Sequence, residues 1–360
     1  MFRLLHEGDV YSTTQDNVYI VGSRIATLPD GKFICTFHSE SKAGINDFVP
    51  MAAYSDDGLH WSEPKPVWPE LIGKKSIFCS VRATGDGRVC ICGACYDIDQ
   101  QGEIWWSDEL AAMKENCLAI SISDDGYHFP APTYVQLPYY AGAENPGGML
   151  VDADGAITIV YAPYPTIEKP EAADTCSLVM MRSTDGGKTF ESCKIGTVNP
   201  PSEYAETWIA RMTDGRLVVS TWQTASKEAP DQYLFSTDNG RTFCGPFASP
   251  FRGQSTALTP WTDGRALIVY NQRKEQPAGV WIAVAKPDET GFNMTENIPV
   301  WKAASTTRNA TGGDFSQWTD FSFGEPHVNV MPDGTLLVCL WYEQAGAKGI
   351  RYVHLAHEED

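Results

Sequence analysis

The stretch TWIARMTDGRLVVSTW (207–222) joins two largely apolar runs through an Asp-Gly pair. This pattern predicts a strand, a tight turn and a second strand, because glycine accepts the positive φ that a two-residue hairpin needs. The phrase occurs six times, as RIATLPDGKFICTF (24–37), SVRATGDGRVCICG (80–93), GMLVDADGAITIVYA (148–162), TWIARMTDGRLVVSTW (207–222), ALTPWTDGRALIVYN (257–271) and VNVMPDGTLLVCLWY (328–342). The turns recur about every 60 residues, so the repeats fill the chain.

Units of this length leave room for two further strands each. Four-stranded antiparallel units repeated radially describe a propeller, whereas solenoids of this period are usually built from helices. Helical periodicity is nearly absent, and its clearest instance, SDELAAMKEN (107–116), predicts a short surface helix. The sequence therefore predicts an all-β chain with one domain, a six-bladed β-propeller over residues 1–360.

A second motif follows the first in four of the units. Its copies are YSDDGLHW (54–61), ISDDGYHF (122–129), STDGGKTF (183–190) and STDNGRTF (236–243). Each has an aspartate third, a glycine fifth and an aromatic residue eighth, which predicts a turn whose carboxylate caps N–H groups of the loop. We expect the third-position aspartates to be structural: Asp56, Asp124, Asp185 and Asp238.

These turns resemble the Asp boxes, or BNR repeats, of the sialidase (neuraminidase) superfamily, and the resemblance covers essentially the whole chain. It implies a six-bladed β-propeller with four-stranded antiparallel blades. KPDETGF (286–292) resembles a degenerate fifth copy. The sixth unit ends too early for a copy, so we expect a strand around residues 4–11 to complete the last blade.

The first strand of each unit is predicted to line the central channel. Residues seven and five positions before each x-Asp-Gly turn should lie on one face at its mouth. In chain order these are Gly22 and Arg24, Phe78 and Ser80, Pro146 and Gly148, Glu206 and Trp208, Ser255 and Ala257, and Glu325 and His327. The charged members either satisfy one another around a water-filled channel or form the pocket of an exo-glycosidase, which needs paired acidic groups.

The resemblance assigns roles residue by residue. Arg24 is similar to the first arginine of the family's clamp on the substrate carboxylate, and Arg273 to another. Asp47 is similar in placement to the acid/base aspartate, and Glu206 to the family's fourth-blade glutamate. Gln254 stands in a GQS phrase similar to one in the family's fifth blade.

Two departures from the family pattern stand out. Glu325 occupies the position where the family has its nucleophilic tyrosine, for which Tyr342 or Tyr204 is a possible substitute. STWQTASKEAPDQYLFS (220–236) contains no second clamp arginine. The departures weaken a sialidase assignment more than they weaken a glycan-processing one.

Two insertions are expected to wall the pocket. The first, 95–116, carries Trp105 and Trp106, whose flat apolar rings suit the faces of sugars, although tryptophan is also ordinary propeller packing. The second is 297–323. The candidate substrate-binding residues are therefore Arg24, His327, Gln254, Arg273, Trp105, Trp106 and Tyr342.

The formal net charge of −19 and the pI near 4.7 argue against nucleic-acid partners and against an anionic membrane surface. The opening MFRLLHEGDVYS shows no cationic segment followed by an apolar one, so we expect a cytoplasmic protein with its ten cysteines as free thiols. Neither ligand spacing nor a phosphate-binding glycine loop appears, so no metal and no cofactor is implied.

The leading hypothesis is an exo-glycoside hydrolase, exo-α-sialidase-like, that releases a terminal sialic or other acidic sugar. Asp47 would be the general acid/base, Glu325 the nucleophile or cation stabiliser, and Glu206 the orienting or activating carboxylate. One alternative is an exo-glycosidase for a neutral sugar, and another is a propeller that binds glycans without catalysis.

Overall fold

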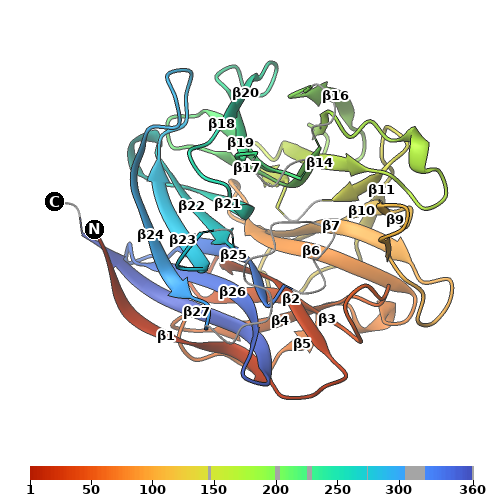
Figure 1. The fold of residues 1–360 in the computed structure, drawn as a ribbon, viewed down its shortest axis with the longest axis horizontal. Helices are drawn as coiled ribbons and strands as arrows, with labels where there is room; N and C mark the ends of the chain where they lie inside the picture. The colour runs from red at the N-terminus through yellow and green to blue at the C-terminus, as the bar shows by residue number, and fades with distance from the viewer. Residues whose placement is uncertain (145–146, 199–202, 225–228, 274, 305–320, 359–360) are drawn as a thin grey trace.

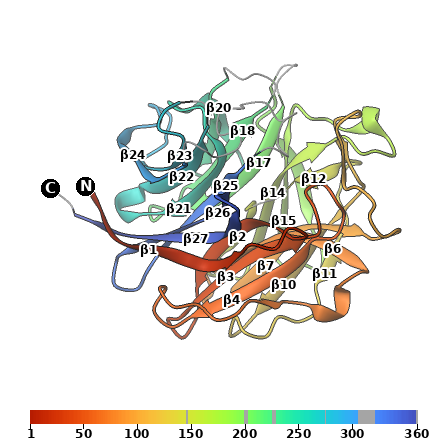
Figure 2. The ribbon, with the colours of Figure 1, turned by 60° about the horizontal axis from the view of Figure 1, so that its bottom comes forward.

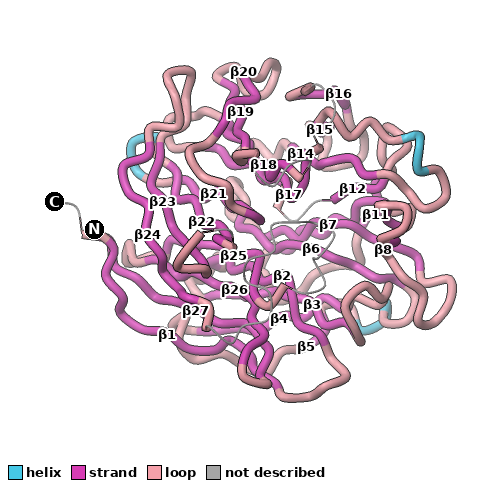
Figure 3. Tube along the Cα trace, in the orientation of Figure 1, coloured by secondary structure: helices cyan, strands magenta, loops and turns pink. Residues whose placement is uncertain are grey.

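The computed structural model describes residues 1–144, 147–198, 203–224, 229–273, 275–304 and 321–358. Six antiparallel sheets stand around one axis like the blades of a propeller (Figure 1), and nearly all of the regular structure is strand (Figure 3). The predicted all-β, six-bladed architecture is confirmed. We number the blades 1 to 6 in chain order.

The first three blades follow the expected order of strands from the axis outward. Blade 1 contains β2 (Tyr19–Thr27), β3 (Phe33–Glu40), β4 (Val49–Ser55) and β5 (Lys65–Pro66). Blade 2 contains β6 (Lys75–Ala83), β7 (Val89–Asp97), β10 (Cys117–Ser123) and β11 (Thr133–Val135). Blade 3 contains a divided first strand, β12 (Gly142–Glu144) and β13 (Met149–Val151), then β14 (Ile157–Tyr164), β15 (Leu178–Ser183) and β16 (Glu191–Ile195).

The last three blades repeat this order. Blade 4 contains β17 (Tyr204–Arg211), β18 (Leu217–Gln223), β19 (Gln232–Ser236) and β20 (Cys244–Ala248). Blade 5 contains β21 (Gln254–Pro260), β22 (Ala266–Gln272), β23 (Gly279–Ala285) and β24 (Met294–Lys302). Blade 6 contains β25 (Phe323–Val330), β26 (Leu336–Gln344), β27 (Ala347–His357) and β1 (Phe2–Thr13). Short 3₁₀ turns lie at Pro69–Leu71, Pro170–Ala172 and Thr262–Gly264.

The Asp-Gly turns join the first and second strands. In blade 4, Gly215 has a φ of 90°, and the Met212 N–H donates a 2.8 Å hydrogen bond to the Arg216 carbonyl across the turn. All seven residues of β18, which follows, are buried. A continuous apolar run is expected of a strand covered on both faces, here by the neighbouring blades. The core therefore lies between the blades.

The turns between the third and fourth strands hold the capping aspartates, at the end of each blade away from the start of its first strand. In blade 3, Asp185 accepts 3.0 Å hydrogen bonds from two backbone N–H groups. In blade 1 the acceptor is Asp57, and in blade 2 it is Asp125. The assignment of this role to Asp56 and Asp124 is wrong, because these two loops are one residue shorter between the serine and the glycine.

The N-terminal strand completes the last blade, as predicted. β1 pairs antiparallel with β27, from Phe2 opposite His357 to Thr13 opposite Lys348. Both ends of the described chain therefore lie on the outer edge of blade 6 (Figure 2). The first and last segments of the chain share one sheet, which closes the ring.

The helix predicted at 107–116 is wrong. This segment forms a small hairpin of β8 (Trp106–Ser107) and β9 (Ala112–Met113), and Met113 also pairs with Thr166 of blade 3. Tertiary pairing overrides a weak local helical preference over so few residues. No helix among the described residues is long and apolar enough to cross a membrane.

Candidate functional site

Four of the six innermost strands carry the same irregularity near their starts. The strand register shifts between Val21 and Arg24, between Ala205 and Trp208, between Gln254 and Ala257, and between Gly324 and His327. A residue within each shift has a positive φ, namely Gly22 (72°), Glu206 (49°), Ser255 (53°) and Glu325 (44°). A bulge of this kind turns a side chain away from the sheet pattern, and strained backbone in non-glycine residues clusters at functional sites.

The displaced residues open into a pocket on the propeller axis. It is bounded by the starts of first strands and the ends of second strands from all six blades, and its volume is about 980 Å³ out to the mouth. More than half of its lining is aromatic. The lining residues are Tyr19, Val21, Glu40, Phe48, Phe78, Ala94, Tyr96, Trp105, Trp106, Met113, Ala143, Tyr164, Glu206, Trp222, Ser255, Arg273, Phe321, Glu325 and Trp341.

Positions seven before the turn supply the polar floor of this pocket. Glu206, Ser255 and Glu325 line it together with Phe78, whereas the corresponding Pro146 lies outside the described residues. In blade 1 the position is Gly22, where a Cβ would collide with the His38 imidazole. The bulge therefore brings acidic side chains from opposite parts of the sequence to one place.

Glu325 is a half-buried carboxyl with an unusual affinity for its proton. Burial raises its pKa to about 7, although the Arg24 guanidinium favours the anion. Glu206 adds to the rise by charge repulsion, and Arg273 opposes it. A carboxyl with a pKa near 7 can carry a proton at neutral pH and give it up within a reaction.

Glu206 has a different environment from Glu325. Its Oε2 accepts a short hydrogen bond from the Ser255 hydroxyl of the neighbouring blade. Burial raises the pKa of Glu206, whereas Ser255, Arg273 and Arg24 each act in the opposite direction. The two glutamates therefore share a pocket but differ in how their anions are stabilised.

Glu40 is a third pocket carboxyl that sequence reasoning missed. It ends β3, opposite Tyr19 in the register, and is 3% exposed. Burial raises its pKa well above the usual range, and the charges of Asp47 and Glu325 raise it further. It lies at the end of a second strand, whereas the predicted channel residues all belong to first strands. The sequence does carry a sign of this residue, because the largely apolar stretch FICTFHSE (33–40) ends in a charged residue, Glu40.

The two arginines predicted to clamp a substrate carboxylate differ in their position relative to the pocket. Arg24 is absent from the pocket lining, and its Nη1 donates to the carbonyls of Ser23 (2.7 Å) and Glu325 (2.8 Å). Arg273 does line the pocket. Its Nη1 donates to Gln254 Oε1 at 2.6 Å, and its Nη2 donates to a backbone carbonyl of β25.

Positions five before the turn form a layer beneath the pocket. His327 Nδ1 accepts a 3.2 Å hydrogen bond from the Ile25 N–H, and burial lowers the pKa of this imidazole, so it is neutral. The Trp208 ring lies 5.2 Å from the His327 ring and packs against Arg24 and Arg82. Arg82 was not predicted, and its Nη1 links blade 2 to blades 3 and 4 by donating to three of their backbone carbonyls.

The remaining candidates lie outside the described lining. Gln254 is buried and supports Arg273. Tyr342, 4% exposed, shares a 3.1 Å hydrogen bond with Ser12 of β1 at the outer edge of blade 6. Asp47 is half-buried, and its Oδ1 accepts a 3.0 Å hydrogen bond from the Ser41 N–H. Asp47 does not line the pocket, but its charge raises the pKa of Glu40, which does.

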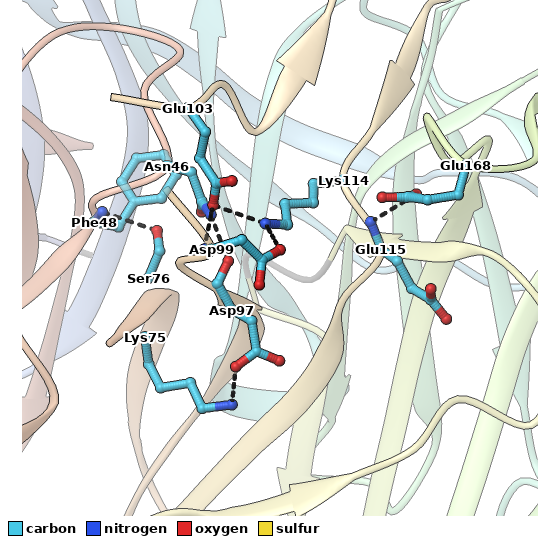
Figure 4. A network of polar contacts seen from close by, with 10 residues as sticks. All are labelled: Asn46, Phe48, Lys75, Ser76, Asp97, Asp99, Glu103, Lys114, Glu115 and Glu168. Carbon is cyan, nitrogen blue, oxygen red and sulfur yellow. Dashed lines mark hydrogen bonds and ion pairs between the residues drawn. The ribbon is translucent and has the colours of Figure 1, made fainter. Parts of the chain in front are cut away.

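Trp105 and Trp106 line the pocket, from the insertion in blade 2. A polar network holds this insertion against the loop between β3 and β4 (Figure 4). Asn46 Nδ2 and Lys114 Nζ each donate to Glu103 Oε1 at 2.7 Å. The backbone N–H of Trp105 also donates a 3.1 Å hydrogen bond to the Gly44 carbonyl. Of the second insertion, residues 305–320 lie outside the described residues, and Phe321 lines the pocket.

No protein-family model and no curated protein sequence matches the chain. Among solved structures, a protein of unknown function from Dyadobacter fermentans is similar, with a TM-score of 0.75 and 17% identity over 99% of both chains. The NanB sialidase from Streptococcus pneumoniae has a TM-score of 0.60 and 12% identity, over 98% of this chain and 70% of that one.

The intramolecular trans-sialidase from Ruminococcus gnavus has a TM-score of 0.58 and 13% identity, over 93% of this chain and 94% of that one. Identities this low carry an argument about architecture and none about activity. The chain has the six-bladed propeller fold that sialidases have.

Proposed function

We propose that this propeller is a glycoside hydrolase that removes a terminal sugar from a glycan or small glycoside. The observation that carries the proposal is the pair Glu206 and Glu325, both at strained positive φ and both in one aromatic pocket on the axis. Glycoside hydrolysis commonly uses two carboxyl groups on either side of the bond to be broken. The likeness to sialidase structures supports the same class of reaction.

The two carboxyls suit different steps. Glu325, with its pKa raised to about 7, would donate its proton to the glycosidic oxygen as the bond from that oxygen to the anomeric carbon breaks. Glu206, whose anion Ser255 and Arg273 favour against the opposing effect of burial, would stabilise the cationic sugar and accept a proton from the attacking water. The water oxygen then bonds to the anomeric carbon.

The test is release of a fluorescent aglycone from a panel of exo-glycosides, including an α-sialoside and neutral glycosides. Glu325→Gln and Glu206→Gln should each lower kcat at least about 100-fold, because each removes an acid–base group. Glu63→Gln is the matched control, since Glu63 is exposed on blade 1 and outside the pocket lining. Full activity of either pocket variant would remove that glutamate from the mechanism.

Asp47→Asn separates two assignments of the acid. If Asp47 is the proton donor, as the family resemblance implies, this variant loses activity most on glycosides with poor leaving groups. If Glu325 is the proton donor, Glu325→Gln is instead the variant that loses activity most on glycosides with poor leaving groups.

A propeller that binds glycans without catalysis is the second candidate, favoured by the aromatic lining. Sugar binding without release from any glycoside would establish it.

A further inference from the structure

We infer that the pocket takes an uncharged sugar, one without a carboxylate, and that Glu40 binds its hydroxyl groups. The inference rests on the proposed function in one respect, that the ligand is a sugar. It names the class of sugar and adds a binding residue that neither the repeats nor the family resemblance indicated.

The charges around the pocket disfavour an acidic sugar. Among the described lining residues there are three carboxyl side chains and one cation, Arg273. Each terminal nitrogen of Arg273 already uses one of its two N–H groups on a protein oxygen, on Gln254 and on β25, so the fork is oriented by the protein. A bidentate clamp needs the two donors of the guanidinium fork turned toward the ligand. A substrate carboxylate would instead enter among Glu40, Glu206 and Glu325 and lose its hydration without a matching cation.

Glu40 has an unused hydrogen-bonding atom. Its Oε2 is buried and has no hydrogen-bond partner among the described residues, although the side chain lines the pocket and is 3% exposed. Leaving such a buried atom unpaired destabilises the folded protein, and a ligand that supplies the partner recovers this loss. A hydroxyl group both donates and accepts, so it matches this carboxyl in either protonation state.

The groups around Glu40 favour its uncharged form. Burial raises its pKa well above the usual range, and the charges of Asp47 and Glu325 raise it further. Tyr19, opposite Glu40 in the strand register, also lines the pocket. A neutral carboxylic acid beside aromatic rings suits a neutral sugar, which presents hydroxyl groups at its rim and C–H groups on its faces.

Binding of free monosaccharides to the unmodified protein, measured by calorimetry at pH 7, tests the inference without turnover. Galactose against galacturonic acid, and glucose against glucuronic acid, are matched pairs that differ only in the carboxylate. Rhamnose, arabinose and N-acetylneuraminic acid complete the panel. At least one neutral sugar should bind about tenfold or more tightly than every acidic one, because one unpaired buried charge is worth at least 1.4 kcal/mol.

Variants of Glu40 test its role. Glu40→Ala should weaken binding of the preferred neutral sugar about tenfold. Glu40→Gln, which keeps a donor and an acceptor, should restore most of the affinity, and Glu63→Ala should leave it unchanged. Thermal unfolding of each variant establishes that it is folded. Unchanged affinity in a folded Glu40→Ala protein overturns the role of Glu40.

The two proposals fail in different ways. An acidic sugar that binds as tightly as every neutral one, or no binding of any neutral sugar at millimolar concentration, overturns the inference. Release from an α-sialoside alone also overturns it, while leaving the protein a glycosidase. Binding of a neutral sugar without release from any glycoside supports the inference and overturns the catalytic proposal.

Discussion

Glu325 shows how one side chain couples the pocket to the stability of the fold. Its carboxyl is half-buried at a bulge, and the loss of hydration there outweighs the two nearby guanidinium groups in setting its pKa. A group that holds its proton more tightly in the folded than in the unfolded chain stabilises the fold only while it is protonated. Burial raises the pKa values of Glu40 and Glu206 in the same direction.

The contribution of Glu325 to the free energy of unfolding should therefore fall as the pH rises from 4.5, the ordinary pKa of a glutamate, to about 7, its folded pKa. Glu325→Gln cannot ionise and should remove this contribution, which is on the order of 3 kcal/mol. Urea unfolding at a series of pH values measures the effect. Glu63→Gln should keep the slope of the unmodified protein, and an equal slope in Glu325→Gln would contradict the shifted pKa.

The neighbouring residues Asp56 and Asp57 should differ sharply in their effect on stability. Asp57 caps two N–H groups of its turn, so Asp57→Ala should lower the free energy of unfolding by about 1 kcal/mol. Asp56 is exposed and pairs with Lys32 at the surface, so Asp56→Ala should change it by less than about 0.5 kcal/mol. Chemical denaturation of the two variants measures both free energies of unfolding. A larger loss in Asp56→Ala than in Asp57→Ala would show that Asp56 is the capping residue.

At the scale of the strand pair, each hairpin is a local unit whose turn carries its own strain. β26 and β27 are joined by Ala345 and Gly346, with φ values of 53° and 78°. Glycine accepts this conformation freely, whereas alanine does not. The same backbone strain is retained at Glu206 and Glu325, where their side chains line the pocket.

Ala345→Gly should raise the free energy of unfolding by about 0.5–1 kcal/mol, because the relief of left-handed strain exceeds the entropy that glycine adds to the unfolded chain. Ala345 is exposed and is not among the residues that line the pocket, the nearest of which in β26 is Trp341. Thermal unfolding measures the gain, and activity should not change. A loss of stability would show that the turn does not strain its alanine.

For the whole molecule, stability depends on closing the ring. Each blade buries its faces only against its neighbours, and blade 6 is completed by β1 from the other end of the chain. Val10 and Phe2 of this strand are buried in the core. A propeller that lacks this strand has an unpaired edge, which favours aggregation as well as unfolding.

Removal of residues 1–13 should therefore lower the melting temperature by more than about 10 °C or cause aggregation, because the complete outer strand of blade 6 is lost. Calorimetry and size-exclusion chromatography measure the two effects. Val10→Asp, which places a charge in the same contact, should give a smaller loss in the same direction. An unchanged melting temperature in the shortened protein would show that three strands are enough for blade 6.

The repeats in the sequence determined the propeller, because Asp-Gly hairpins and buried apolar strands are local patterns set by neighbouring residues. The same register correctly predicted Glu206, Ser255 and Glu325 as neighbours, since one position in each repeat meets the axis. Only the tertiary structure decided the rest. Glu40 reaches the pocket from a second strand, Arg24 and His327 lie beneath it, and the segment after Trp106 pairs with blade 3 instead of forming a helix. These outcomes depend on bulges and on contacts between blades, which join residues far apart in the chain and leave no periodic trace in it.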